Sequence, residues 1–164
     1  MLDNPRMSTV KIITILSSIA LSFSVCAATL EGKVIAIHDG DTLTLLVDRR
    51  QVKVRLAEID APELNQAFGN RSRQSLGGLC FGKAAVVEQT DKDRFGRVVG
   101  KVRCGGIDAI AAQVQKGMAW VYARYAKPTS HLWFLQNEAR RSRGGLWTDP
   151  HPLEPWKWRT RNAR

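Results

Sequence analysis

Residues 42–57 read TLTLLVDRRQVKVRLA, and this stretch predicts two strands joined by a polar connection. The first strand is expected at Thr42–Val47 and the second at Gln51–Ala57, where aliphatic residues alternate with Lys53, Arg55 and Ala57. The aliphatic face packs into a core, so Arg55 is expected to face the other side of the sheet.

Three further strands are predicted from apolar runs bounded by turn residues: Leu30–Ile37, Ala84–Thr90 and Arg97–Arg103. Helices are expected at residues 66–79, from about Ile107 to Gly117, and from near Ser130 to Gly144. Five short strands with interspersed helices predict an α+β protein that is mainly β and forms a small closed antiparallel barrel. A five-stranded OB-fold barrel with about three helices fits this pattern.

The composition is that of one basic domain. At 164 residues the chain is too short for two ordinary domains, and 25 Lys and Arg against 15 Asp and Glu give a net charge of +10. Such a surface favours polyanions, including nucleic acid and anionic lipid. A cationic protein without a polyanionic partner is the alternative.

Residues 1–28 have the pattern of a secretory signal peptide. Arg6 and Lys11 precede an apolar run at residues 12–25, and small residues then place cleavage after Ala27 or Ala28. The run is shorter than the roughly 20 residues of a membrane span, although an uncleaved anchor is the alternative. Cleavage would leave a secreted or periplasmic protein of net charge +9 with no stable membrane association.

We expect the folded domain at residues 29–159, followed by a basic tail at 160–164 that is partly disordered. Loss of the signal peptide would leave two cysteines, Cys80 and Cys104. In an oxidising compartment they are candidates for a disulfide, with two buried thiols as the alternative. The bridge would close a loop of about 25 residues and stabilise the fold by roughly 3 kcal/mol.

Two acidic motifs flank the 42–57 stretch: Asp39-Gly40-Asp41-Thr42 before it and Asp60-Ala61-Pro62-Glu63 after it. Asp-Gly alone usually marks a turn, and the second motif alone is more often a solvated loop. Together, the carboxylates of Asp41 and Asp60 are suitable ligands for Ca²⁺, and Glu63 lies close enough to hold a metal-bound water.

Two arginines accompany these acids. Arg55 precedes the second acidic motif, and Arg97 follows the turn Asp93-Arg94-Phe95-Gly96. Phosphodiester cleavage builds negative charge on phosphate oxygens, and arginine forks stabilise that charge. Either arginine alone more often pairs with a surface carboxylate, but the combination indicates a metal-dependent phosphodiesterase.

With these motifs in place, the chain resembles the staphylococcal nuclease family from about Leu30 to Arg159. The closing segment at residues 155–159 and the signal-like N-terminus look like its secreted, often plasmid-borne bacterial members. Six motifs in order carry the resemblance: Asp39-Gly40-Asp41-Thr42, Val54-Arg55-Leu56, Ile59-Asp60-Ala61-Pro62-Glu63, Asp93-Arg94-Phe95-Gly96-Arg97, Gly117-Met118-Ala119-Trp120 and Gly145-Leu146-Trp147.

The resemblance implies an OB-fold barrel and a Ca²⁺-dependent endonuclease. Such enzymes cut DNA and RNA with little sequence preference and leave 3′-phosphates; we expect a monomer. The resemblance assigns catalytic roles to Arg55, Glu63 and Arg97. It assigns calcium to the Asp41 and Asp60 carboxylates and the Ala61 carbonyl, with Asp39 supporting these ligands from behind.

The chain departs from the best-known family member at three places. Ala61 replaces a Thr, so a hydroxyl is lost although the backbone carbonyl remains. Phe95 replaces a Tyr, and residues 120–127 are one residue longer, which leaves the roles of Tyr122 and Tyr125 open. Some OB domains of the family are non-catalytic modules that bind nucleic acid or proteins; a calcium-binding structural protein is a further alternative. The retained acids and arginines favour the enzyme.

Overall fold

The structure is a computed structural model that describes residues 28–163. Apart from Ala28, the predicted signal peptide lies outside the described residues. No helix in the described range has the length and apolar character needed to cross a membrane.

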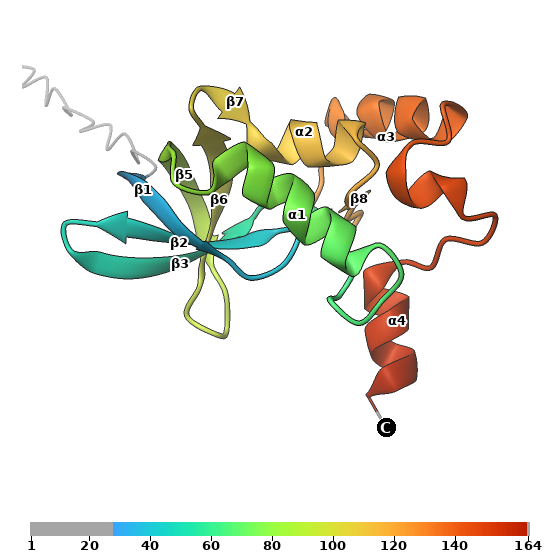
Figure 1. Cartoon of the computed structure of the whole chain (residues 1–164), viewed down its shortest axis with the longest axis horizontal. Helices are drawn as coiled ribbons and strands as arrows, with labels where there is room; N and C mark the ends of the chain where they lie inside the picture. The colour runs from blue at the N-terminus through green and yellow to red at the C-terminus, as the bar shows by residue number, and fades with distance from the viewer. Residues whose placement is uncertain (1–27, 164) are drawn as a thin grey trace, which may run out of the picture.

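Five strands close into a barrel (Figure 1). They are β1 (Thr29–Ile37), β2 (Thr42–Val47), β3 (Arg50–Leu56), β5 (Ala84–Lys92) and β6 (Val98–Cys104). Their order is β3-β2-β1-β5-β6, and pairing of β3 with β6 completes the ring. The five-stranded barrel predicted from the sequence is therefore confirmed, and the strand bounds differ from the prediction by two residues at most.

The closing pair corrects one part of that prediction, because β3 and β6 run parallel while the other barrel pairs are antiparallel. The reason is geometric. Strand direction cannot alternate all the way round a closed ring with an odd number of strands, so one adjacent pair must share a direction. An alternating sequence pattern predicts each strand but not this constraint.

The β2–β3 hairpin supplies much of the barrel core. Leu43 pairs with Val54, and Leu45 pairs with Val52, which puts these apolar side chains on one face. Asp48 and Arg49 form the turn with φ angles of 46° and 66°, the left-handed values that a tight two-residue hairpin turn uses. This register places Arg55 opposite Thr42, at the end of the barrel where the acidic motifs lie.

The helices lie outside the barrel (Figure 1). They are α1 (Gly69–Cys80), α2 (Ala109–Gln115), α3 (Leu132–Arg141) and α4 (Pro155–Asn162), with a short 3₁₀ turn at Gly145–Thr148. Two-residue strands β4 (Ile59–Asp60) and β8 (Trp120–Val121) pair with each other, and β7 (Ile107–Asp108) pairs antiparallel with the end of β6. The first three helices match the predicted ones.

Helix α4 was not predicted. The sequence suggested disorder beyond Arg159, whereas the helix continues to Asn162. Pro155 stands in its first turn, where the missing N–H costs nothing. Trp156 anchors the helix by stacking on Tyr122, with ring centroids 4.8 Å apart and planes within 6°. The sequence did not indicate this contact, because Tyr122 lies far from Trp156 in the chain and the segment around Trp156 is mainly basic.

A second apolar cluster fixes the C-terminal third of the chain. Trp120, Ala139, Leu146 and Trp147 are buried together, with Phe68 and Trp156 packed against them. Gly117 and Gly145 both have positive φ angles, and their backbones are in contact beside this cluster. A Cβ on Gly145 would clash with the Gly117 carbonyl oxygen. The Gly117 and Gly145 motifs of the sequence therefore bring two chain segments into contact.

Candidate active site

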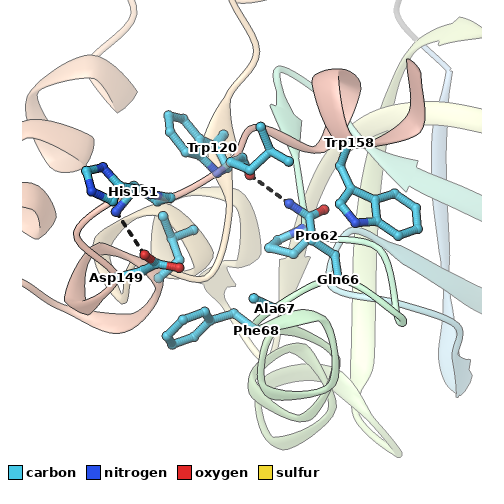
Figure 2. Close-up of a pocket in the computed structure, with 11 residues that line it drawn as sticks. Pro62, Gln66, Ala67, Phe68, Trp120, Asp149, His151 and Trp158 are labelled. Atoms are coloured by element: carbon cyan, nitrogen blue, oxygen red, sulfur yellow. Dashed lines mark hydrogen bonds between the residues drawn. The ribbon is translucent and has the colours of Figure 1, made fainter. Parts of the chain in front are cut away.

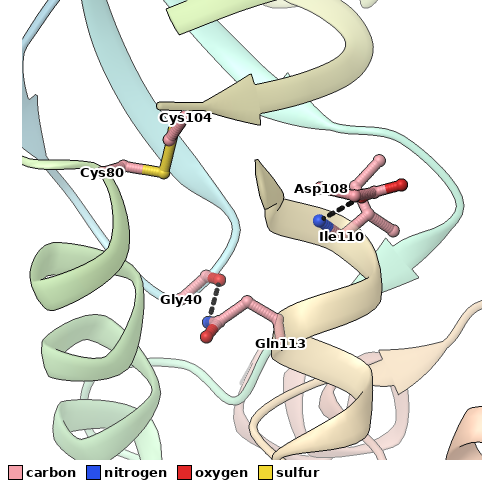
Figure 3. The surroundings of a disulfide bond; sticks show 6 residues. All are labelled: Gly40, Cys80, Cys104, Asp108, Ile110 and Gln113. Carbon is pink, nitrogen blue, oxygen red and sulfur yellow. Dashed lines mark hydrogen bonds between the residues drawn. A yellow bond between two sulfur atoms is a disulfide. The ribbon is translucent and has the colours of Figure 1, made fainter. Parts of the chain in front are cut away.

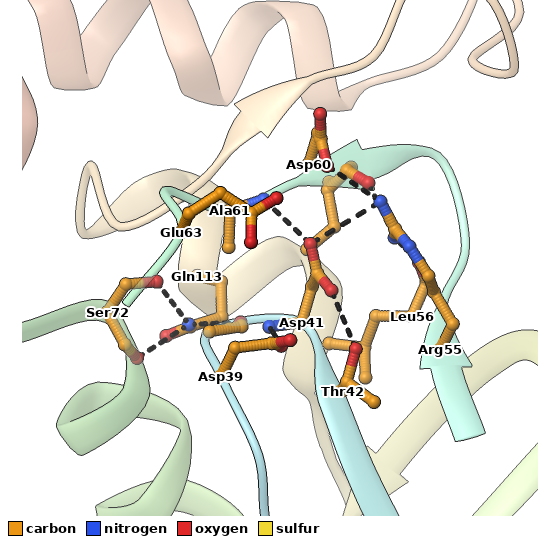
Figure 4. A network of polar contacts seen from close by, with 12 residues as sticks. Asp39, Asp41, Thr42, Arg55, Leu56, Asp60, Ala61, Glu63, Ser72 and Gln113 are labelled. Atoms are coloured by element: carbon orange, nitrogen blue, oxygen red, sulfur yellow. Dashed lines mark hydrogen bonds and ion pairs between the residues drawn. The ribbon is translucent and has the colours of Figure 1, made fainter. Parts of the chain in front are cut away.

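Asp39, Asp41, Asp60 and Glu63 gather with Arg55 at one end of the barrel (Figure 4). Asp39 and Asp41 come from the β1–β2 turn, Arg55 from the end of β3, and Asp60 from β4. The Leu56 N–H donates to the Asp41 carbonyl at 2.8 Å and ties the β2 and β3 ends together. The sequence placed these residues on separate segments, and the barrel register brings them to one place.

Asp41 is the central acid of the group. Its Oδ2 accepts a 2.7 Å hydrogen bond from the Ala61 N–H, and its Oδ1 accepts one from the Thr42 hydroxyl at 3.0 Å. The Asp39 Oδ1 accepts from the Asp41 N–H at 3.0 Å. These bonds join the two acidic motifs directly, although twenty residues separate Asp41 from Ala61.

Arg55 is held on several sides. Its Nη2 lies 2.8 Å from Asp60 Oδ1 and 3.5 Å from Asp41 Oδ2. Its Nη1 donates to the carbonyls of Leu56 and Ile59 at 3.0 and 2.9 Å. Burial opposes the charge, but Asp41 and Asp60 outweigh this effect and raise the pKa of Arg55 above its ordinary value. The guanidinium is a fixed positive charge at the site.

Asp60 and Glu63 share a second arginine that sequence reasoning did not assign to the site. Arg159, on α4, places Nη2 2.8 Å from Asp60 Oδ2 and Nη1 2.7 Å from Glu63 Oε1. Its Nη1 also donates to Asp60 Oδ1 at 3.2 Å. The only available signal was the family-like closing segment at residues 155–159, which indicated an ordered end without indicating its position.

Two acids of the site, Asp39 and Asp60, have raised pKa values. Burial and then the neighbouring charge of Asp41 raise the pKa of Asp39 to about 6. Burial likewise raises the pKa of Asp60, although the hydrogen bond from Arg159 opposes the shift. Carboxylates held together in this way favour an additional cation among them.

The oxygen atoms present fit a hard cation such as calcium. The donor set consists of carboxylates and a backbone carbonyl, with neither imidazole nor thiolate, and this is the ligand chemistry of Ca²⁺ and Mg²⁺. Among residues 28–163, no three acidic, histidine or cysteine side chains form a metal cluster by themselves. Two carboxylates, a carbonyl and waters would therefore have to complete the shell.

Arg97 is the one predicted catalytic residue that does not reach this group. Its Nε binds Asp93 Oδ2 at 2.6 Å, and its guanidinium lies 5.6 Å from the ring of Phe95. The β3–β6 register pairs Arg55 with Val99, and Arg97 precedes Val99 by two residues, directly before β6 begins. Two residues of strand span about 7 Å, a distance that an arginine side chain can cover.

A buried amide supports the first acidic motif from behind (Figure 4). Gln113, in α2, is fully buried and donates to the Gly40 carbonyl at 2.7 Å and to the Ser72 carbonyl at 3.1 Å. A Cβ on Gly40 would lie 1.7 Å from the Ser72 hydroxyl, so only glycine fits there. Sequence reasoning missed Gln113 because a glutamine in a helix gives no sign that it faces the core.

A disulfide joins the elements behind this support. Cys80, at the end of α1, is bonded to Cys104, at the end of β6 (Figure 3). Both residues are fully buried. The bridge ties the helix that carries Ser72 to the barrel wall.

A small pocket lies between the α4 segment and the start of α1 (Figure 2). Its volume is about 190 Å³, and its lining includes Pro62, Gln66, Phe68, Trp120 and Trp158. The Gln66 side-chain amide donates to the Leu153 carbonyl at 2.7 Å and accepts from the Glu63 N–H at 3.2 Å. Gln66 thus links the Glu63 loop to the segment that leads into α4.

The family model described as staphylococcal nuclease homologue matches residues 53–149 of this chain. The chain belongs to the staphylococcal nuclease family. The resemblance inferred from the six motifs is confirmed. The matched range includes Arg55, Asp60, Glu63 and Arg97, whereas Asp41 precedes it and Arg159 follows it.

Several curated members of the staphylococcal nuclease family are similar over most of their length. Micrococcal nuclease of Shigella flexneri is 46% identical over 154 residues, covering 87% of this chain and 88% of that protein. Protein ParB of Escherichia coli is 45% identical over 142 residues, covering 80% of each. An uncharacterized endonuclease of Escherichia coli is 40% identical over 141 residues, covering 85% of this chain and 92% of that one.

Proposed function

We propose that this protein is a calcium-dependent endonuclease that hydrolyses the phosphodiester bonds of DNA and RNA with little sequence preference and leaves 3′-phosphates. Membership of the staphylococcal nuclease family supports the nuclease activity, and so do relatives named micrococcal nuclease and endonuclease at 40–46% identity. The observation that carries the proposal is the convergence of Asp41, Arg55, Asp60 and Glu63 at one end of the barrel.

Asp41, Asp60 and the Ala61 carbonyl would hold the calcium ion, and Asp39 would orient Asp41 through its backbone N–H. The ion supplies a doubly positive charge for the substrate phosphate and a site for water. The raised pKa values of Asp39 and Asp60 support this assignment, because a cation among the acids would stabilise their ionised forms.

Glu63 is the proposed general base, which accepts a proton from the attacking water. Its carboxylate is partly exposed, with 34% of the side chain accessible, so a water molecule can approach it. We assign it the orientation of the attacking water and the removal of its proton.

Arg55 stabilises the negative charge that develops on the phosphate oxygens during attack. Its guanidinium is already fixed by two backbone carbonyls, so little reorganisation is needed when the charge appears. Arg97, the residue before β6, would join Arg55 by giving up its ion pair with Asp93 and binding the phosphate.

The basic surface then recruits the polyanion. A net charge of +10 favours nucleic acid through release of its counterions and without reading of bases. The signal-like residues 1–28 and the disulfide support action outside the cytoplasm, in the periplasm or medium.

The test is cleavage of plasmid, single-stranded DNA and RNA by the mature domain, with Ca²⁺ or with a chelator. We expect cleavage only with Ca²⁺, and a roughly 10²- to 10³-fold lower rate for Arg55→Ala, because one charge-stabilising donor is lost. Arg50→Ala is the matched control, because Arg50 is an exposed residue of the same strand. This variant should cleave at the wild-type rate. No cleavage with Ca²⁺, or equal rates for Arg55→Ala and wild type, would contradict the proposal.

A further inference from the structure

Arg159 occupies the carboxylates that the proposed function assigns to the metal and to the water. Its two terminal nitrogens contact both oxygens of Asp60 and one oxygen of Glu63, at 2.7–3.2 Å. This contact joins residues 96 and 99 positions apart, so it is a product of the tertiary fold.

Asp60 cannot keep all these partners and also coordinate a metal ion. Its Oδ1 already accepts hydrogen bonds from Arg55 and Arg159, and its Oδ2 accepts one from Arg159. Its side chain is 2% accessible, which leaves little room for a further ligand. Coordination of Asp60 therefore requires one guanidinium to leave.

Arg159 is the one that can leave. Arg55 is bound to two backbone carbonyls besides its acids, and only 17% of its side chain is accessible. Arg159 binds Asp60 and Glu63 alone among the described residues, and 42% of its side chain is accessible. Solvent screening makes partly exposed ion pairs much weaker than buried ones.

Helix α4 can stay in place when the guanidinium leaves. Pro155 is buried, and Trp156 packs on Tyr122 and, with ring centroids 6.0 Å apart, on Trp120. These contacts lie one helical turn before Arg159 and do not involve the acids. The released guanidinium would therefore remain close to the site.

We propose that Arg159 is a built-in counter-ion of the metal-free enzyme, which competes with calcium for Asp60 and is displaced when the ion binds. Without metal, Arg159 compensates the negative charges of Asp60 and Glu63, and Glu63 has no other ion-pair partner among the described residues. With metal, the doubly charged ion replaces it. This inference rests on the proposed function, because it takes Asp60 as a calcium ligand.

The test is calcium binding by isothermal titration calorimetry, without substrate. Arg159→Gln removes the competing charge, so we expect roughly three- to tenfold tighter binding, in keeping with the modest strength of a partly exposed ion pair. Arg161→Gln is the matched control. Arg161 lies two residues further along the same helix, is exposed and forms no ion pair with any described residue, so its variant should bind like wild type.

Thermal unfolding gives a second, independent readout. In chelator, Arg159→Gln should melt below wild type, and saturating Ca²⁺ should raise its midpoint more than it raises that of wild type. Should Arg159→Gln fail to fold without metal, Arg159→Lys serves instead. It keeps the charge but loses the fork, so its affinity for calcium should fall between those of wild type and a fully released site.

Equal or weaker calcium binding by Arg159→Gln would overturn the competition while leaving the proposed function intact. The failure of wild type to bind calcium at all, together with no calcium-dependent cleavage, would overturn the proposed function and this inference with it.

Discussion

At the scale of single residues, the site depends on acids that the fold forces together. Asp39 and Asp41 share one turn, and Asp60 reaches them from β4. Arg55 compensates part of this charge from a fixed position. The metal-free protein therefore carries electrostatic strain at the place where its chemistry is proposed to occur.

This strain predicts an unusual pH dependence. The folded pKa of Asp39, about 6, lies above the ordinary value of 3.8, so the folded state holds the proton more tightly than the unfolded state. The resulting stability is complete below about pH 4 and is lost as the pH rises through about 6. In chelator, the free energy of unfolding of Asp39→Asn should thus exceed that of wild type by about 3 kcal/mol at pH 7 and by only about 0.5 kcal/mol at pH 4.

Urea unfolding at several pH values in chelator measures this difference. Asp91→Asn removes an exposed carboxylate on β5 and controls for the change in net charge. A stability difference between Asp39→Asn and wild type that stays constant from pH 4 to pH 7 would contradict the assignment.

At the scale of elements, the position of the acidic turn depends on helix α2 rather than on the barrel alone. Gln113 reaches from α2 to the Gly40 carbonyl and connects it to Ser72 of α1. The amide therefore fixes the backbone between Asp39 and Asp41. Removing this amide should change the position of Asp41, a proposed metal ligand, although Gln113 does not contact the Asp41 side chain.

Gln113→Leu should lower the free energy of unfolding by about 1–3 kcal/mol, because the buried carbonyls of Gly40 and Ser72 lose their donor. It should also weaken calcium binding by roughly tenfold, as is common when a supporting contact of a ligand is removed. Denaturant unfolding and calorimetry measure the two effects. Gln115→Leu, at an exposed position of the same helix, is the control. Lost stability with unchanged calcium affinity would limit Gln113 to a structural role.

At the scale of the whole molecule, the disulfide and α4 bind distant parts of the chain to the barrel. The Cys80–Cys104 bridge spans 24 residues and joins α1 to β6. Helix α4 returns the C-terminal end to the site through Trp156 and Arg159. The disulfide fixes α1 to the barrel, and Arg159 connects α4 to Asp60 and Glu63 in the second acidic motif.

Replacing both cysteines with serine should cost about 3 kcal/mol of stability, since the unfolded chain regains the freedom of the closed loop. Wild type in reductant should show a similar loss, and the double variant should not respond to reductant. Finding two titratable thiols in the unfolded mature protein, without reductant, would show that the bridge does not form.

The sequence alone was sufficient for the strands, three of the helices and the family. Alternation in residues 42–57 predicted the hairpin. The motifs marked the four acids and Arg55 that the fold brings together, but they also marked Arg97, which pairs with Asp93 instead, and gave Arg159 no role. These features are local, since each depends on residues within a few positions of one another.

The tertiary structure decided what local patterns cannot encode. Closure of an odd-numbered ring made β3 and β6 parallel, core packing turned Gln113 toward Gly40, and a partner 99 residues away gave Arg159 its place. Gln113 and Arg159 contact partners that are distant in the sequence, so the residues next to them in the chain carry no information about those partners. The direction of β3 relative to β6 likewise depends on closure of the whole ring.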